Sequence, residues 1–148
     1  MTDLDTARQA ALAAEHRAVY GYGLLGPHLA AATRPLARRA QDTHAALRDQ
    51  LTDVLIAAAQ TPAASLASYP DMKPIRSVGA ALRLATALEE ACASAWRYVY
   101  AVAAESGPST TASTRTSAQL ALTDCAVRAT RWRRAAGDAS PTVAFPGI

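Results

Sequence analysis

Residues 11–25 read ALAAEHRAVYGYGLL, and this stretch decides how the chain folds. Its apolar residues recur at spacings of three and four, which is the pattern of one face of an α-helix. Glu15 lies in the middle of that apolar stripe. The sequence therefore predicts a long helix from Asp3 to Leu25 that carries a carboxylate on its apolar face. Gly26 and Pro27 are expected to end or kink this helix.

Three further segments show the same helical period. Proline suits the first position of a helix, serine suits the cap before it, and glycine suits the position after its end. The predicted helices run from Pro35 to about Gln60 with Thr33 or Arg34 as the cap, from the Ser77 cap to about Glu105 before Gly107 and Pro108, and from roughly Thr111 to Ala136 before Gly137.

Two segments between and after these helices contain prolines and lack a helical pattern. Thr61 to Arg76 holds three prolines and predicts a connection of about sixteen residues between the second and third helices. In a four-helix bundle, one long crossover of this kind lets the two helices run parallel. The tail from Asp138 to Ile148 carries two prolines and three large apolar residues, so we expect it to pack as an extended strap over the bundle.

The composition supports an all-α fold. The 148 residues are 51% hydrophobic but only 5% aromatic and 18% charged, and alanine alone makes up about a quarter of the chain. Alanine is the best helix former, and glycine is scarce. These values argue against a β-sandwich, a disulfide scaffold, a disordered chain and a collagen-like fibre. They predict a single alanine-rich helical bundle domain over residues 1–148.

The charges and the cysteines point to no specific nucleic-acid partner and to a reducing compartment. Fifteen basic residues against 12 acidic ones give a net charge of +3, without the basic stripe that nucleic-acid proteins show. The one cluster of arginines is interpreted as closing the last helix, with phosphate binding as the alternative. The two cysteines lie far apart, in no zinc spacing. The arginine cluster consists of Arg128, Arg131, Arg133 and Arg134, and the two cysteines are Cys92 and Cys125.

No apolar run predicts a membrane segment. The N-terminus is acidic and lacks the apolar core of a signal peptide. The longest apolar run, Val54 to Ala59, is far shorter than the ~18 residues of a membrane span. We therefore expect a soluble, cytoplasmic protein without a membrane partner.

Polar side chains on the apolar stripes mark the candidate site. His44 lies on the stripe of the second helix and Glu89 on that of the third, at depths that match Glu15 on the first. A buried carboxylate is costly unless it is paired or binds a metal. Glu15 is expected to pair with His44 or with an arginine such as Arg48, and Tyr20 and Tyr22 can add hydroxyl groups. Arg48 and Asp49 are expected to stabilise a helix end or an interhelical contact. The full candidate cluster is Glu15, His16, Tyr20, His44, Arg48, Asp49, Glu89 and Asp124.

Four short stretches carry a resemblance to a known family. AEHRAVYGYG at 14–23, HAALRD at 44–49, AVRATRW at 126–132 and AFPG at 144–147 resemble actinobacterial ferritin-like proteins of unknown function. The resemblance spans nearly the whole chain, and its glutamate-histidine and aromatic-glycine run is the most specific part. It implies a ferritin-like four-helix bundle with a long crossover between the second and third helices.

The resemblance also implies where a di-iron site would lie. Ferritin-like di-iron proteins place a Glu on each of two helices and Glu-x-x-His on each of the other two. Glu15 and Glu89 take the two single positions. The second helix offers Gln41 and His44 in place of Glu-x-x-His, and the fourth offers Asp124 and Val127. The di-iron ligand set is therefore incomplete.

These observations favour a non-enzymatic binding or scaffold protein that uses no cofactor and forms a homodimer. Two alternatives stay open. One is a diverged di-iron or mononuclear oxidase or hydroxylase, with iron or manganese held by Glu15, His44 and Glu89. The other is a small-ligand carrier with the polar core as its pocket. The glycines at 21, 23 and 26 suggest either the close approach of another backbone, such as a partner helix, or a loosened helix end before Pro27.

Overall fold

The fold is all-helical in a computed structural model that describes residues 1–72, 74–107 and 111–148. In these residues it contains four α-helices, one short 3-10 helix and no strand. The elements are α1 (Asp3–Leu25), η1 (Gly26–His28), α2 (Arg34–Ala57), α3 (Val78–Glu105) and α4 (Ala112–Ala135). The prediction of an all-α chain with four long helices is confirmed.

Local side-chain chemistry fixes the helix starts. Thr2 and Asp5 form a capping box on α1: the Thr2 hydroxyl accepts from the Asp5 N–H at 3.1 Å, and the Asp5 carboxylate accepts from the Thr2 N–H at 3.1 Å. Ser77 caps α3 as predicted, because its hydroxyl accepts from the Ala80 N–H. Thr33 precedes α2, whose first turn contains Pro35.

The helix ends follow the predicted breakers with one correction. α2 ends at Ala57 rather than Gln60, because Ala59 turns the chain with a φ of 55° and the Gln60 N–H bonds back to the Leu55 carbonyl. Gly107 follows the end of α3 with a φ of 99°, a left-handed conformation that favours glycine. Pro108, the second residue expected to end this helix, lies outside the described residues, as does Lys73 within the predicted loop.

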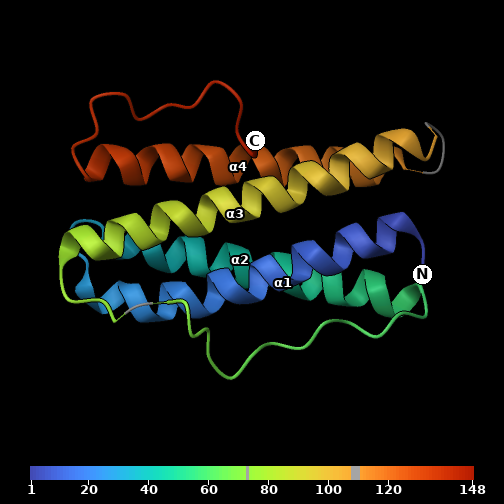
Figure 1. Cartoon of the computed structure of the whole chain (residues 1–148), viewed down its shortest axis with the longest axis horizontal. Coiled ribbons are helices and arrows are strands. Elements are labelled where there is room, and N and C mark those ends of the chain that lie inside the picture. The colour runs from blue at the N-terminus through green and yellow to red at the C-terminus, as the bar shows by residue number, and fades with distance from the viewer. Residues whose placement is uncertain (73, 108–110) are drawn as a thin grey trace.

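Figure 1 shows how the helices are arranged. α1 packs against α2 and α3, and α3 packs against α4. α2 and α3 run in the same direction in this view, and the chain between them returns along the length of the bundle. The tail after α4 arches above that helix instead of lying flat on it. No helix in the described part of the chain is long and apolar enough to cross a membrane.

Small side chains fill much of the core. Seven alanines of α1, α3 and α4 have no exposed surface, and the buried apolar residues form two clusters. One cluster surrounds Leu12, Leu55 and Trp96, and the other surrounds Tyr22 and Trp132. The polar cluster lies where the two meet, since its hydrogen bonds reach Trp96 on one side and Tyr22 on the other.

Gly21 serves packing within the chain and not the approach of a partner helix. A Cβ at this position would lie 2.6 Å from Leu88 Cδ1, so the side chain of α3 occupies the space that glycine leaves. Gly23 and Gly26 are less crowded. A Cβ would meet Gln41 at 3.4 Å in the first case and nothing within 4 Å in the second.

Candidate polar site

Glu15 on α1 and His44 on α2 form the first half of the buried site. Glu15 Oε2 lies 2.6 Å from His44 Nδ1, and both side chains have no exposed surface. The other oxygen, Glu15 Oε1, accepts a 2.6 Å hydrogen bond from the indole Nε1 of Trp96 on α3. Both oxygens of this carboxylate are therefore partnered, as burial requires.

Glu89 on α3 forms the second half. Its Oε1 atom accepts from the Tyr22 hydroxyl at 2.5 Å and from Arg128 Nε at 2.8 Å, and it lies 3.2 Å from His44 Nε2. Its Oε2 atom has no hydrogen-bond partner among the described residues, although it is buried. Glu89 therefore links side chains from all four helices through one oxygen.

The two carboxylates determine the charge of His44. Burial alone would lower the pKa of the imidazole, but its hydrogen bonds to Glu15 and Glu89 outweigh this and raise the pKa to about 10. Both ring nitrogens lie on carboxylate oxygens, which fits a ring that donates from both. His44 is therefore an imidazolium ion at neutral pH.

Arg128 supplies a second positive charge from α4. Burial opposes that charge, but the Glu89 carboxylate raises the pKa of the guanidinium further above its ordinary value. In return, His44 and Arg128 hold the pKa of Glu89 below its ordinary value against the effect of burial. Two carboxyl groups thus face two cations in one closed cluster.

Two aromatic residues extend the cluster toward the second apolar core. Tyr22 donates to Glu89 and accepts a 2.8 Å hydrogen bond from the indole of Trp132, and its ring stacks on His44 with centroids 5.6 Å apart. Burial and the nearby Glu89 charge raise the pKa of the Tyr22 phenol far above its ordinary value. The hydroxyl therefore stays protonated and acts as a donor.

The two cysteines lie beside the cluster. Cys92 and Cys125 are free and buried, and the Arg128 guanidinium donates to Cys125 Sγ at 3.3 Å. The contact with Cys125, together with burial and the nearby Glu15 carboxyl group, raises the pKa of the Cys92 thiol well above its ordinary value. Cys92 is thus an unreactive thiol rather than a thiolate nucleophile.

The structure brings three of the eight predicted site residues together and separates the other five. Glu15, His44 and Glu89 converge. His16 and Tyr20 instead contact the segment between α2 and α3: His16 Nε2 lies 3.0 Å from the Ala63 carbonyl oxygen, and Tyr20 packs on Tyr69 with ring centroids 5.1 Å apart. Their positions at the border of the stripe turn them toward this segment.

Arg48, Asp49 and Asp124 also lie outside the cluster. The Arg48 guanidinium bonds to Asp49, its neighbour in sequence, on the surface of α2. Of the two partners expected for Glu15, the structure therefore shows His44 and not Arg48. Asp124 is exposed on α4 and does not reach inward, because Cys125 takes the buried position beside it.

Sequence reasoning missed Arg128, Trp96 and Trp132 as members of the site. Arg128 was expected at a helix C-terminus or on a phosphate. The signal that finds it is its spacing, since it lies three residues after Cys125 and four before Trp132 on the buried stripe of α4. Tyr22 was expected only as one of two tyrosines that could add a hydroxyl, and it alone does so.

The residues present do not fit a di-iron centre. Of the six positions that the ferritin-like pattern requires, Asp124 and Val127 face solvent, and Gln41 donates to the Val19 carbonyl. In the three remaining side chains, every ligand atom except Glu89 Oε2 already contacts another member of the cluster or accepts from Trp96, Tyr22 or Arg128. A single cation has a closer candidate set in Glu15, His44 and Cys92, whose ligand atoms lie within 4.8 Å of one another.

Comparison with known proteins places the chain in a family. Residues 7–148 match the model of a domain of unknown function, DUF4439. A crystal structure of a conserved hypothetical protein from Mycobacterium tuberculosis is 34% identical, covers 91% of this chain and 98% of its own, and superposes with a TM-score of 0.81. No curated protein matches. The family match covers nearly the whole sequence, and the chain therefore belongs to the DUF4439 family.

Proposed function

We propose that the protein is a ferritin-like binding or scaffold protein whose buried polar cluster works without a metal ion. The observation that carries this proposal is the placement of Arg128. Its guanidinium bonds to Glu89 at 2.8 Å and puts a permanent positive charge where a metal-binding carboxylate would hold a cation. With His44 also cationic, the two carboxyl groups already have two charge partners.

The ferritin-like arrangement is part of the same proposal. The four helices, and the segment 58–77 that returns along the bundle, support it, with that segment as the long crossover. The cluster then has a structural role, because it ties α1, α2, α3 and α4 together at one depth. Binding would take place elsewhere on the molecule, since the cluster itself is closed to solvent.

Metal analysis tests this proposal. Protein purified without chelator from cells supplemented with iron, manganese and zinc is expected to contain each metal well below one ion per chain. Adding these ions should leave the thermal midpoint unchanged, whereas a ligand at 100 times its Kd would add about 2.7 kcal/mol of stability. One ion per chain that disappears in both Glu15→Ala and His44→Ala would overturn the metal-free proposal.

A mononuclear metal enzyme is the second candidate. The grouping of Glu15, His44 and Cys92 favours it, because carboxylate, imidazole and thiolate together suit zinc or iron. This candidate requires His44 to lose its proton and Cys92 to ionise, against the direction in which the surroundings shift both pKa values. Cys92→Ser separates it from the di-iron alternative, which does not use the thiol.

Two further properties stand as proposals. We propose a homodimer, which sedimentation at micromolar concentration tests, since a particle with the mass of one chain would exclude it. A cytoplasmic location is supported by the two buried thiols, which are unbonded in the structure. Recovery of both thiols in reduced form from rapidly quenched cells is the expected result.

A further inference from the structure

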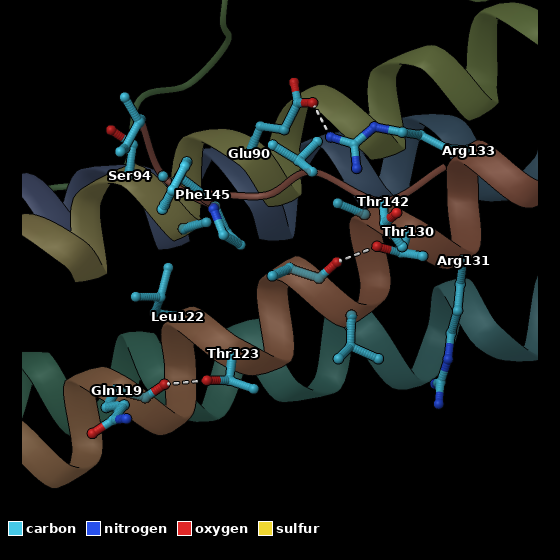
Figure 2. A pocket seen from close by; sticks show the side chains of 18 of the residues that line it. Glu90, Ser94, Gln119, Leu122, Thr123, Thr130, Arg131, Arg133, Thr142 and Phe145 are labelled. Atoms are coloured by element: carbon cyan, nitrogen blue, oxygen red, sulfur yellow. Dashed lines mark hydrogen bonds and ion pairs between the residues drawn. The ribbon is translucent and has the colours of Figure 1, made fainter. Parts of the chain in front are cut away.

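A large cavity lies between the C-terminal tail and the outer faces of α3 and α4. Its volume is about 750 Å³, within the range of sites that hold small organic ligands. Figure 2 looks into it. Leu122 and Phe145 are among the residues that line it, and no member of the buried polar cluster is. The cavity is therefore separate from the site described above.

The tail is fixed at both ends of the cavity. At one end Arg133 on α4 donates to the Pro141 carbonyl at 3.1 Å. At the other end Gly147 has a φ of 83° and lies so close to α3 that a Cβ would be 2.9 Å from the Ala93 carbonyl oxygen. The chain between these two anchors arches away from the helices, as Figure 1 shows.

Large apolar side chains on this arch keep much of their surface in contact with water. Phe145 is 70% exposed and Val143 is 49% exposed, although both line the cavity. Tail residues of this kind were expected to pack on the bundle, and they do not. An apolar occupant beneath the arch would remove their surface from water, which is favourable in proportion to the area covered.

The floor of the cavity is less polar than its sequence suggests. The Thr123 hydroxyl donates to the Gln119 carbonyl at 2.8 Å, and the Thr130 hydroxyl donates to the Ala126 carbonyl at 3.0 Å. Figure 2 draws both bonds along α4. Because these hydroxyl groups bond to their own helix, the floor offers a ligand mainly methyl and alkyl surface.

Positive charge gathers at one end of this apolar space. Three arginines of α4 line the cavity, against one carboxylate, and Arg133 pairs with that carboxylate on Glu90. Arg131 and Arg134 are exposed and make no ion pair with any residue that the structure describes. The C-terminal dipole of α4 offsets only about half a charge, so an excess of positive charge is left.

We infer that this cavity binds an amphipathic monocarboxylate, with its alkyl chain between Leu122 and Phe145 and its carboxylate near Arg131 and Arg134. The apolar walls fit the chain, and the two unpaired guanidinium groups fit the anion. Figure 2 shows the Arg131 side chain extending from α4 away from Phe145, so this exposed side chain turns toward the cavity when the anion binds. The inference deepens the binding role proposed above and rests on it, since it names a ligand class for that role. It does not depend on whether the buried cluster holds a metal.

Calorimetry with three C12 probes tests both halves of the ligand. Dodecanoate is expected to bind the full chain saturably with one molecule per chain, below the concentration at which it forms micelles. Dodecyltrimethylammonium has the same tail with the opposite charge and is expected to bind at least about tenfold more weakly. Dodecanol, which has no charge, should bind between the two.

Variants at exposed positions locate the site without threatening the fold. Arg131→Ala/Arg134→Ala should weaken dodecanoate about tenfold and change dodecanol binding by less than about twofold. Phe145→Ala should weaken both probes to a similar extent. The matched controls are Arg39→Ala, which removes one charge from exposed α2 surface, and Leu120→Ala, which removes an exposed side chain of α4 outside the cavity.

Three results would overturn the inference. The first is no saturable dodecanoate binding by the wild-type chain. The second is equal loss of affinity in the cavity variants and in the two controls, which would mean unspecific adsorption. The third is a dimer that Phe145→Ala dissociates, which would make a second copy of the chain the occupant. None of these results bears on metal content, so a failure here is distinct from a failure of the metal-free cluster.

Discussion

Glu89 shows how one buried atom can join four helices. Its Oε1 atom has three hydrogen-bonding neighbours on α1, α2 and α4, while Oε2 has none among the described residues. Of these neighbours, Arg128 alone carries a permanent charge. A buried ion pair adds little over a well-packed apolar pair, but removal of one partner leaves a buried charge unpaired.

Arg128→Met should therefore destabilise the protein by about 3–5 kcal/mol, because the variant leaves Glu89 with too little positive charge. Urea denaturation followed by circular dichroism measures this loss. Arg48→Ala is the control, since its half-exposed pair with Asp49 should contribute no more than about 1 kcal/mol. Equal losses in the two variants would show that Arg128 does not compensate the Glu89 charge.

The pH dependence of stability reports on His44. Its pKa is about 10 in the folded protein against an ordinary value of 6.5, so the folded state holds the proton more tightly. This stabilisation is complete below about pH 6.5 and is lost as the pH rises toward 10. The free energy of unfolding should fall by up to about 1.4 kcal/mol per pH unit in that window.

Urea midpoints at pH 7, 8 and 9 check this slope. His44→Gln should flatten it, because the variant has no proton to lose, whereas His28→Gln on the exposed η1 turn should keep it. At the acid end Glu89 acts in the opposite direction. Because its pKa is lowered in the folded protein, Glu89 stabilises the folded state at pH values above the ordinary pKa of a glutamate. This stabilisation is lost as the pH falls below that value. A wild-type slope that His44→Gln leaves unchanged would assign the titration to another group.

The site could be predicted from sequence only where a polar residue interrupts an apolar stripe. Glu15, His44 and Glu89 have that signal. Tyr20 and Tyr22 could not be separated by composition, but two residues span about 200° of a helix, so only one of them can face the cluster. Arg128 was hidden because it is one of four nearby arginines, and only its spacing from Cys125 and Trp132 on the buried stripe distinguishes it in the sequence.

At the scale of one helix, the glycines of α1 differ in what surrounds them. Gly21→Ala should destabilise the protein by about 1–3 kcal/mol, because the new methyl group would lie 2.6 Å from buried Leu88. Gly23→Ala should instead stabilise it by up to about 1 kcal/mol, since this position is exposed and alanine favours the helix. Thermal midpoints of the two variants, which make the same change two residues apart, provide the comparison. Gains of equal size would show that Leu88 moves aside without cost.

The C-terminal tail gives a test of its own. Gly147→Ala should release the end of the tail, since alanine disfavours the φ of 83° and its Cβ would meet the Ala93 carbonyl. Limited proteolysis should cut residues 138–148 faster, while the free energy of unfolding of the bundle, from urea denaturation, stays within about 0.5 kcal/mol of the wild type. Gly137 also has a left-handed φ of 83°, but a Cβ there would meet nothing within 4 Å. Gly137→Ala is therefore the control that separates the effect of backbone strain from the effect of the clash with Ala93. Unchanged cleavage in Gly147→Ala would mean that this contact does not hold the tail.

The whole arrangement was predictable to the extent that it follows from helical period and breakers. The end of α1 follows from Gly26, the start of α3 follows from its cap Ser77, and the end of α3 follows from Gly107. The path of the tail was not predictable, because Phe145 and Val143 have the sequence of a packed strap and the structure leaves them exposed. Their positions depend on two long-range contacts, through Arg133 and Gly147, that no local pattern shows.

Across the whole molecule, the cluster should couple helices that touch little. α4 packs on α3 while α1 packs on α2 and α3, yet Glu15 on α1 connects to Arg128 on α4 through His44 and Glu89. The destabilisations of Glu15→Gln and Arg128→Met should therefore not add, and urea denaturation of both single variants and the double variant should give an interaction of about 0.5–3 kcal/mol. Thr2→Ala, which removes the distant α1 cap, should add to Arg128→Met within about 0.5 kcal/mol. Additive behaviour in both pairs would mean that the hydrogen bonds of Glu15 and Glu89 act as separate local contacts, and that His44 does not transmit a change at α1 to α4.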